Sequence, residues 1–319
     1  MSSGAQQSAD CADTEAEPIS RRTADGSFSL HSPQYGEGFH AASGAVREAR
    51  EKFIAPAALE RFPSGQSLTV LELAVGTATN TAALIEACVQ AGLTLRWWGL
   101  EIDPRPLRLA LADQGFRRQW QPATLAKLTA LQRHGGWSQG GIPDGNGVDQ
   151  GRLLLGDARR HLPALIGELQ GRCHLVLHDA FSPQRCPQLW SLELLGGLAS
   201  LLRPEGRLLT YSAAAAVRTA LQAQGLQLAS IRPAAGCGGW SAGTAASPTT
   251  LADSGCLRPL SAMERDHLRT RAGIPYRDPT GSEDAATIQQ RRAIEQQHSS
   301  APSSSAWRRG WQRKPSTDA

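Results

Sequence analysis

Apolar and polar positions repeat in one pattern along the middle of the chain. Short apolar runs alternate with segments that have helical spacing, which predicts alternating strands and helices. Strands are predicted at 68–73, 94–100, 152–155, 173–177, 206–211 and 226–231, with helices over about 79–91, 122–133, 189–202 and 213–224. Repeated strand–helix units with apolar strands indicate an α/β fold with a doubly wound, mostly parallel sheet covered by helices on both faces.

The first of these strands ends in a turn made of small residues. Residues 68–80 read LTVLELAVGTATN, so the strand passes through Ala74, Gly76 and Ala78 directly into a helical pattern. Such a turn lets backbone N–H groups approach a ligand closely, although small residues also serve tight strand–helix packing. Glu101 follows the second strand, where an acid hydrogen-bonds a ribose. Turn and acid together indicate a nucleoside cofactor, and the lack of a full GxGxxG favours S-adenosylmethionine over a dinucleotide.

Two further acids follow predicted strands, and the carboxyl ends of parallel strands are where such sheets bind ligands. Asp157 comes after the strand at 152–155, and we expect it near the adenine of the cofactor. Asp179 opens the segment HDAFSPQRCPQLW, beside the expected sulfonium. For an amine acceptor, Asp179 would orient the nitrogen or take its proton; the alternative is that it only caps a turn. Pro183 and Trp190 could shape a pocket for a flat base, with Trp190 equally expected in the core.

The composition divides the 319 residues into four parts. Hydrophobic residues make up 40%, somewhat below a typical globular chain. We expect a disordered N-terminal segment over 1–34, a folded domain over 35–260, a helical appendage over 261–297 and a disordered basic tail over 298–319. Within the domain, the glycine-rich stretch 134–151 and residues 234–255 are expected to be loops.

Charge and cysteine usage indicate which partners and which cellular compartment to expect for the protein. The net charge of +4 is mildly basic and does not by itself indicate nucleic acid. The tail interleaves cations with indoles, which suits phosphates and unpaired bases, although a solubilising tail that binds nothing fits equally well. Those tail residues are Trp307, Arg308, Arg309, Trp311, Arg313 and Lys314. We expect a cytoplasmic protein without a membrane span, a secretion signal or a metal site, because no 18-residue apolar segment, cationic start or zinc-like cysteine spacing occurs.

Six segments in fixed order resemble the MnmC-type tRNA methyltransferase domain. They are YGEGFHAASGAVREAREKFI (35–54), LELAVGTATN (71–80), LEIDP (100–104), LLLGDARRHLP (153–163), HDAFSPQRCPQLW (178–190) and LRPEGRLLTYSAAAAVRTALQAQG (202–225). The resemblance implies a Rossmann-like fold and S-adenosylmethionine as donor. It also implies tRNA as partner and methylation of the aminomethyl group of 5-aminomethyl-(2-thio)uridine at the wobble position.

The resemblance also assigns roles to single residues. It implies cofactor contacts from Gly76, Thr77, Asn80, Glu101 and Asp157, with Asp179 as the acid near the acceptor nitrogen. We further expect Glu72 to contact the cofactor, Asp179 to be catalytic, and the substrate contacts to come from Tyr35, Phe181, Pro183 and Trp190. Tyr35 with Glu48 and Phe53 matches the segment that covers the site. The family turn is richer in glycine, so Ala74 and Ala78 are departures that would cost energy at a positive φ.

The sequence leaves three interpretations open: the tRNA methyltransferase that the resemblance implies, and two rivals. Bifunctional members of the family also carry a flavin-dependent oxidase half, and we expect this chain to rely on a separate enzyme for that step. One rival is an aminopropyltransferase-like or small-amine methyltransferase. Paired acids that hold a diamine would favour this rival, and the segment after Asp179 offers Phe181, Ser182 and Pro183 but no second acid. The other rival is a non-catalytic RNA-binding protein whose cofactor turn has degenerated.

Overall fold

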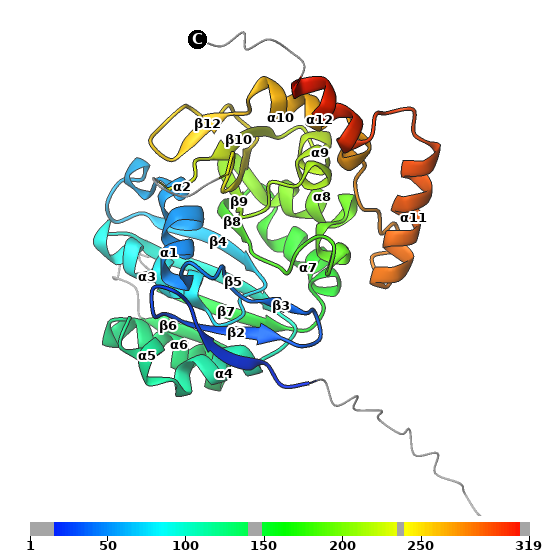
Figure 1. Cartoon of the computed structure of the whole chain (residues 1–319). Coiled ribbons are helices and arrows are strands. Elements are labelled where there is room, and N and C mark those ends of the chain that lie inside the picture. Colours follow the sequence, from blue (N-terminus) through cyan, green and yellow to red (C-terminus); the bar gives the residue numbers. More distant parts are fainter. Residues whose placement is uncertain (1–15, 140–148, 235–238, 313–319) are drawn as a thin grey trace, which may run out of the picture.

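A single sheet of nine strands forms the centre of the computed structural model, which describes residues 16–139, 149–234 and 239–312 (Figure 1). Its order is β12-β10-β11-β9-β8-β4-β5-β7-β6. The parallel strands are β4 (Ser67–Leu73), β5 (Thr94–Glu101), β7 (Asp149–Leu155), β8 (Cys173–His178) and β9 (Leu202–Thr210). The antiparallel strands are β6 (Gly136–Gln139), β10 (Gln227–Ile231), β11 (Gly243–Ser247) and β12 (Leu257–Pro259). The α/β fold with a mostly parallel, doubly wound sheet is confirmed.

The strand order reverses between β4 and β8. From β4 the chain adds β5 and then β7 on one side, and it then crosses back to add β8 and β9 on the other side. Helices on two sides of a reversal point leave a crevice beyond the carboxyl ends of the strands, which is where such sheets bind ligands. This topology places the ends of β4, β5 and β8 together.

Helices cover both faces of the sheet, as the apolar strands predict. One face carries α1 (Ala45–Ala49), α3 (Thr79–Gln90), α4 (Arg105–Ala112), α5 (Gln114–Arg117) and α6 (Pro122–His134). The other carries α7 (Ala158–Leu169), α8 (Leu192–Leu201) and α9 (Ala215–Ala223). Two apolar cores result, one between each helical layer and the sheet. Strand β8 is buried along its full length, as expected for a strand covered on both faces.

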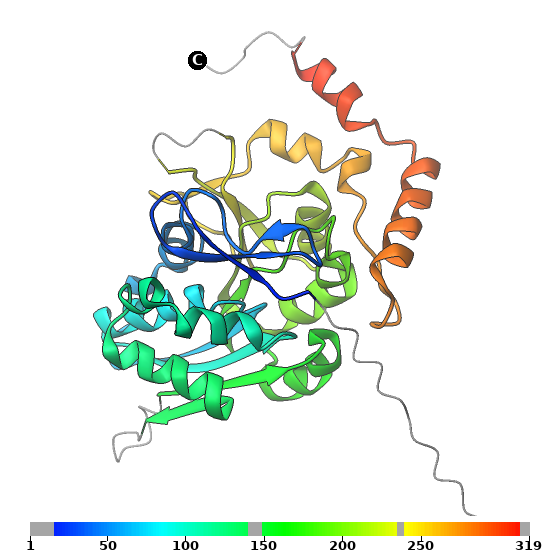
Figure 2. The same ribbon diagram turned by 60° about the horizontal axis from the view of Figure 1, so that its bottom comes forward.

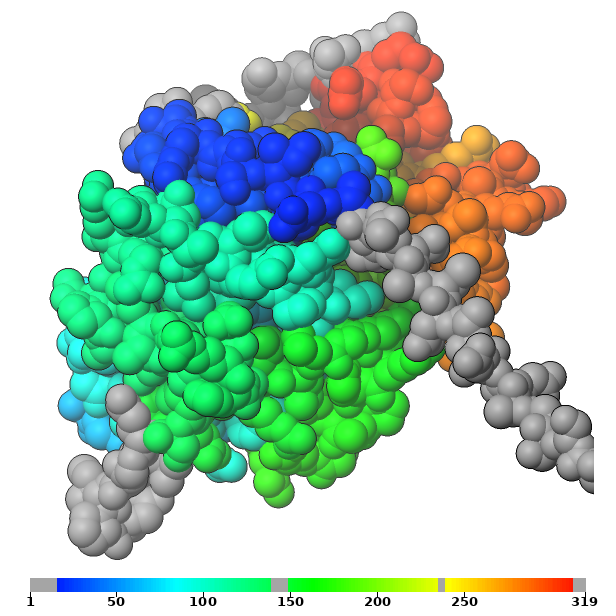
Figure 3. Space-filling view, turned by 90° about the horizontal axis from the view of Figure 1, so that it is seen from below, coloured from blue at the N-terminus to red at the C-terminus, as the bar shows by residue number. Residues whose placement is uncertain are grey.

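The N-terminal segment is folded over residues 16–34, so the prediction of disorder there is wrong. Strands β1 (Ile19–Arg22), β2 (Phe28–Ser32) and β3 (Glu37–Gly38) form an antiparallel sheet. Phe28 and Leu30 are buried, and the Phe28 ring meets the edge of Phe116 in α5. Figure 3 shows this blue segment packed against the cyan and green half of the protein. The segment is ordered by contacts distant in sequence. Residues 1–15 lie outside the described residues.

A continuous helical path leads from the N-terminal sheet to β4. Helix α1 continues through the π-helical turn η1 (Arg50–Ile54) into α2 (Ala55–Ala57), and the turn η2 (Leu59–Arg61) follows. Phe53 in η1 is fully buried in the core beside the sheet. This packing fixes the position of the helical segment, which brings Glu48 of α1 and Lys52 of η1 to the cavity at the sheet edge.

Two predicted loops contain strands. The stretch 243–247, GTAAS, forms β11 between β9 and β10, with Ala245 and Ala246 fully buried. Glycine and alanine have low strand propensity, so only the flanking strands make this a strand. Residues 136–139 likewise form β6, whose Trp137 ring lies over Gly151 at a place where a Cβ would meet it at 2.1 Å. Residues 140–148 and 235–238 lie outside the described residues.

The C-terminal part consists of helices that border the domain (Figure 2). They are α10 (Ala262–His267), the turn η4 (Arg271–Gly273), α11 (Ala285–His298) and α12 (Ser304–Gln312). The prediction of a disordered tail over 298–319 is therefore wrong for 304–312, while 313–319 lie outside the described residues. The indoles of Trp307 and Trp311 both donate to Oδ2 of Asp266, at 3.0 and 2.6 Å, and hold α12 against α10. None of the helices in the described ranges is long and apolar enough to cross a membrane.

Candidate functional site

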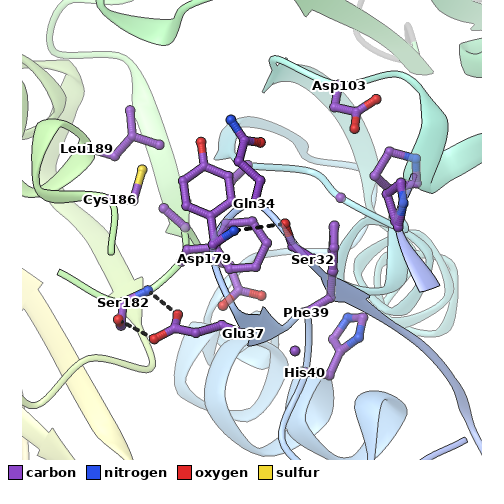
Figure 4. Close-up of a pocket in the computed structure, with 18 of the residues that line it drawn as sticks. Ser32, Gln34, Glu37, Phe39, His40, Asp103, Asp179, Ser182, Cys186 and Leu189 are labelled. Carbon is purple, nitrogen blue, oxygen red and sulfur yellow. Dashed lines mark hydrogen bonds between the residues drawn. The ribbon is translucent and has the colours of Figure 1, made fainter. Parts of the chain in front are cut away.

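A cavity of about 460 Å³ lies at the carboxyl ends of β4, β5 and β8 (Figure 4). Its floor is the turn after β4, one side is the tip of β5, and the opposite side is the loop after β8 that contains Asp179. The N-terminal segment 32–41 closes it from above. The structure thus brings Tyr35, Gly76, Glu101, Asp179 and Phe181 of the predicted site to one cavity.

The turn between β4 and α3 has a left-handed backbone at three alternate residues. The φ angles of Ala74, Gly76 and Ala78 are 62°, 55° and 61°. A left-handed conformation costs a residue with a Cβ roughly 1–2 kcal/mol, so the two alanines are strained as their sequence positions predict. Gly76 has a second constraint, because a Cβ there would lie 3.2 Å from the ring of Phe39.

Glu101 braces this turn while facing the cavity. Its Oε2 accepts the Gly76 N–H at 2.7 Å, and its Oε1 accepts the N–H groups of Ile102 and Asp103 at 2.8 and 2.9 Å. Burial raises the pKa of Glu101, and these three donors oppose that rise. The carboxylate keeps remaining acceptor capacity toward the cavity, where hydroxyl groups of a ligand can reach it.

Glu72 and Thr77 lie behind the cavity wall. Glu72 in β4 is fully buried, and its Oε2 accepts hydrogen bonds from Thr81 Oγ1 at 2.8 Å and Trp97 Nε1 at 2.9 Å. Burial raises the pKa of Glu72 to about 7. Thr77 Oγ1 bonds Thr79 Oγ1 at 2.7 Å. Both residues hold the strand and the helix start in place from behind.

Asp179 lies at the end of β8 and is bonded to the first turn of α3. Asn80 Nδ2 donates to Asp179 Oδ2 at 2.7 Å, and the Asp179 N–H donates to the Leu73 carbonyl at 3.2 Å. Burial raises the pKa of Asp179 well above its ordinary value, and the carboxylate of Glu48 raises it further. A carboxylate with a raised pKa in a cavity is suited to accepting a proton near neutral pH.

Asp157 lies in an adjoining recess of about 90 Å³, which Tyr35, Ala74 and Glu101 share with the main cavity. It caps α7, accepting the Arg159 N–H at 2.9 Å, and forms an ion pair with the Arg159 guanidinium at 2.7 Å. Burial alone would raise the pKa of Asp157, but the hydrogen bonds and charge of Arg159 hold it below its usual value. Arg159 also pairs with the buried Asp278 at 2.7 Å, which ties the recess to the C-terminal part.

Aromatic rings line the cavity near Asp179. Tyr35 stacks on Phe181 with centroids 4.4 Å apart, and Phe39 meets Phe181 edge to face at 5.1 Å. Glu37 fixes the two segments together by accepting hydrogen bonds from Ser182 N and Oγ at 2.9 and 2.5 Å (Figure 4). Flat apolar walls with a few polar groups are typical of a pocket for a planar ring.

Pro183 and Trp190 are buried outside the cavity lining. Trp190 donates from Nε1 to the Phe181 carbonyl at 2.7 Å, and its ring lies 4.0 Å from that of His178. Burial lowers the pKa of His178 to about 4, so that ring is neutral. Trp190 therefore belongs to the core, one of the two places expected for it, and it positions the loop that carries Phe181.

Sequence reasoning missed several polar residues of the cavity. Lys52 Nζ lies 2.5 Å from Glu48 Oε1 and 5.7 Å from the centre of the Tyr211 ring, while the Tyr211 hydroxyl donates to the Ala180 carbonyl at 2.9 Å. The polar residues Glu37 and His40 and the apolar Phe39 also line the cavity. A lone lysine in a helix full of charges gives no signal in the sequence, and only the fold brings it to the strand ends.

Comparison with known proteins defines the class of this chain. Residues 145–247 match the model of a family described as S-adenosyl-L-methionine-dependent methyltransferase. The crystal structure of MNMC2 from Aquifex aeolicus superposes with a TM-score of 0.71, covering 89% of this chain and 87% of that one at 23% identity. The fold and the family match together define an S-adenosyl-L-methionine-dependent methyltransferase domain.

Curated relatives narrow the class further. The chain is 32% identical over 220 residues to the tRNA 5-methylaminomethyl-2-thiouridine biosynthesis bifunctional protein MnmC of Pseudomonas aeruginosa, covering 66% of this chain and 30% of that protein. It is 28% identical over 258 residues to the protein of the same name from Chromobacterium violaceum, covering 75% of this chain and 36% of that protein. The chain thus spans about a third of the length of these relatives. It carries an MnmC-like methyltransferase domain.

The cavity fits the cofactor that this family implies. Along the turn after β4, Ala74 contributes only a methyl group to the cavity lining and Gly76 has no side chain, with the ring of Phe39 next to it. The carboxylate of Glu101 stands beside that turn and retains acceptor capacity. A close backbone turn and an adjacent acid are what an amino-acid moiety and a ribose require.

Proposed function

We propose that this chain methylates the aminomethyl nitrogen of 5-aminomethyl-(2-thio)uridine at the wobble position of tRNA, with S-adenosyl-L-methionine as donor. The observation that carries the proposal is the half-buried carboxylate of Asp179, which accepts a hydrogen bond from Asn80. It lines the same cavity as Gly76 in the turn after β4 and as the stacked rings of Tyr35 and Phe181. The similarity to MnmC proteins, whose name includes this tRNA modification, supports the choice of acceptor.

The proposal gives each part of the cavity a task. Gly76 and Glu101 hold the amino-acid and ribose parts of the cofactor, and Asp157 lies on the adenine side. When bound, S-adenosyl-L-methionine supplies a methyl group for in-line displacement, so the protein contributes mainly alignment and exclusion of water. The stacked rings of Tyr35 and Phe181 offer an apolar wall against which the uracil packs.

Asp179 manages the proton of the acceptor. An alkylamine is a cation near neutral pH, and it must lose a proton before its lone pair can attack the methyl carbon. Asp179 orients the nitrogen and takes that proton, and burial, which raises the pKa of Asp179, favours the transfer. Asn80 keeps the carboxylate oriented throughout.

The test uses the full chain with tRNA that carries 5-aminomethyl-2-thiouridine. After incubation with S-adenosyl-L-methionine, the tRNA is digested and its nucleosides are analysed by mass spectrometry. We expect the wobble nucleoside to gain the mass of one methyl group. Parallel reactions with free small amines, and with decarboxylated cofactor as aminopropyl donor, separate the rival enzymes. Product only in those reactions would overturn the proposal, and no cofactor binding in calorimetry would exclude every methyltransferase role.

The proposal also sets the chain in a sequence of reactions. The aminomethyl group must be produced before it can be methylated, and we propose that a separate flavin-dependent enzyme supplies it. A tRNA substrate also implies that the protein works in the cytoplasm.

A further inference from the structure

A partly buried ion pair lies in the wall of the cavity beside the proposed acceptor position. Lys52 Nζ lies 2.5 Å from Glu48 Oε1, and the two side chains are only 20% and 10% exposed. The other oxygen of Glu48 accepts the Ala41 N–H at 2.6 Å, which ties the pair to the segment above the cavity. Both residues line the cavity together with Asp179 and Tyr211.

The remaining titratable groups around this pair come from several elements. They are Glu37 of β3, His40 after β3, Glu72 of β4, Glu101 of β5, the ion pair of Asp103 and Arg105 after β5, Cys186 of the loop after β8, and Tyr211 after β9. Burial lowers the pKa of His40 to about 4 and raises those of Tyr211 and Cys186, so these three are neutral near pH 7. Lys52 and Arg105 both line the cavity, and Arg105 pairs with Asp103 at 2.8 Å, whereas Lys52 pairs with Glu48.

We propose that Lys52 is a positioning residue that neutralises Glu48 and so lets the acceptor amine lose its proton at Asp179. The inference rests on the proposed function, because it concerns the amine at that same site. It assigns Lys52 a part in the reaction that acts through Glu48.

The reason lies in the charge balance at the acceptor nitrogen. One proton is shared between the amine and Asp179, and it must leave the amine before the lone pair attacks. A second uncompensated carboxylate nearby would hold the cationic amine more tightly and raise the pH at which that proton is lost. Glu48 would act as such a carboxylate if Lys52 did not pair with it at 2.5 Å. In the ion pair, Glu48 still accepts the hydrogen bond of the Ala41 N–H, while Lys52 cancels its negative charge.

The experiment compares pH profiles of kcat for full-length protein on tRNA that carries 5-aminomethyl-2-thiouridine. Lys52→Met and Lys52→Gln remove the cation, Lys52→Arg keeps it, and Lys52→Met/Glu48→Gln removes both charges. The Glu48→Gln side chain still offers an oxygen to the Ala41 N–H. The matched control is Lys127→Met, because Lys127 also pairs with a carboxylate, Asp149, at 2.5 Å with a side chain only 6% exposed, but outside the cavity.

We expect the acid limb of kcat to move up by about one pH unit in Lys52→Met and Lys52→Gln, which is about a tenfold loss at a pH below the limb. The loss should shrink as the pH rises. The limb should return toward the wild-type position in the double variant, and Lys52→Arg and Lys127→Met should keep it there.

Other outcomes would overturn the inference. A uniform fall in kcat at every pH would mean that Lys52 only stabilises the fold, and a double variant shifted as far as the single one would exclude Glu48 as the charge that matters. If the wild-type protein methylates this tRNA but the pH profiles of the Lys52 variants are unshifted, the role of Lys52 is refuted and the proposed function stands. A wild-type protein that transfers no methyl group to this tRNA would refute the proposed function and the inference with it.

Discussion

Asn80 Nδ2 donates to Asp179 Oδ2 over 2.7 Å, and this bond joins the start of α3 to the loop after β8. The two residues are 99 positions apart in the chain, yet the strand order places their elements side by side at the reversal point of the sheet. The same helix start follows the turn that faces the cavity. One side chain thereby couples the proposed cofactor turn to the proposed acceptor site.

Asp179→Asn should abolish most methyl transfer while leaving the cofactor affinity nearly unchanged. The substitution keeps the size of the side chain and an oxygen that can accept from Asn80, but it removes the group that takes the proton. Proton transfer by a positioned side chain contributes about 10²–10⁴-fold, so a loss in that range is expected in single-turnover methylation of tRNA. Calorimetry with the cofactor is the control. Near-normal turnover would show that Asp179 only caps the turn.

Glu72→Gln should change how stability depends on pH. Burial raises the pKa of Glu72 from 4.5 to about 7, so the folded state binds a proton that the unfolded state has already released. Wild-type stability should therefore fall between about pH 4.5 and 7 because of this group and level off above pH 7. At about 1.36 kcal/mol per pKa unit, the contribution is roughly 3 kcal/mol.

In Glu72→Gln, the part of the fall in folding stability that comes from Glu72 should be absent. Urea unfolding of both proteins at pH 5, 6, 7 and 8 would measure this difference. Asp113→Asn is a suitable comparison, since Asp113 lies at the start of α5, away from β4. Parallel pH curves for wild-type protein and Glu72→Gln would mean that Glu72 is ionised in the folded state throughout this range.

Ala74→Gly should make the turn after β4 more stable. Alanine at a φ of 62° pays the left-handed penalty, and glycine avoids it at the cost of a more flexible unfolded chain, so a net gain of about 0.5–1 kcal/mol is expected. Cofactor affinity should rise as well, because Ala74 lines the cavity. Ala58→Gly is the matched control: its φ is 51°, and it lies outside the cavity lining. It should gain stability only, and equal effects of both variants on cofactor affinity would contradict a special role for Ala74.

Arg308→Gln/Arg309→Gln should weaken tRNA binding and reduce its salt dependence. Trp307 and Trp311 hold α12 on Asp266, and both arginines are exposed on that helix. Two lost phosphate contacts would flatten the slope of log affinity against log salt by up to about 1.5 units. Arg117→Gln/Arg118→Gln on α5 is the comparison. If only that second pair changed the slope in fluorescence titrations, tRNA would be held by the α5 surface and α12 would be a passive extension.

The sequence by itself was sufficient for the parallel part of the central sheet and for the residues at the ends of those strands. Strands such as β4 and β8 are mostly apolar, because helices bury them on both faces, and such runs stand out from their neighbours. Small residues after β4 and single acids after β5 and β8 mark the ends of those strands. In a parallel sheet those ends share one edge, so Gly76, Glu101 and Asp179 could be placed together without a structure.

Only the tertiary structure decided the parts that depend on distant contacts. β11 is made of glycine, alanine, serine and threonine, and it becomes a strand because β9 and β10 supply its hydrogen bonds. The segment 16–34 and α12 lack a strong local pattern, and burial of Phe28 and the indole bonds to Asp266 order them. Likewise, Trp190 turned inward and Lys52 reached the cavity, because packing between elements far apart in the chain sets where a side chain lies.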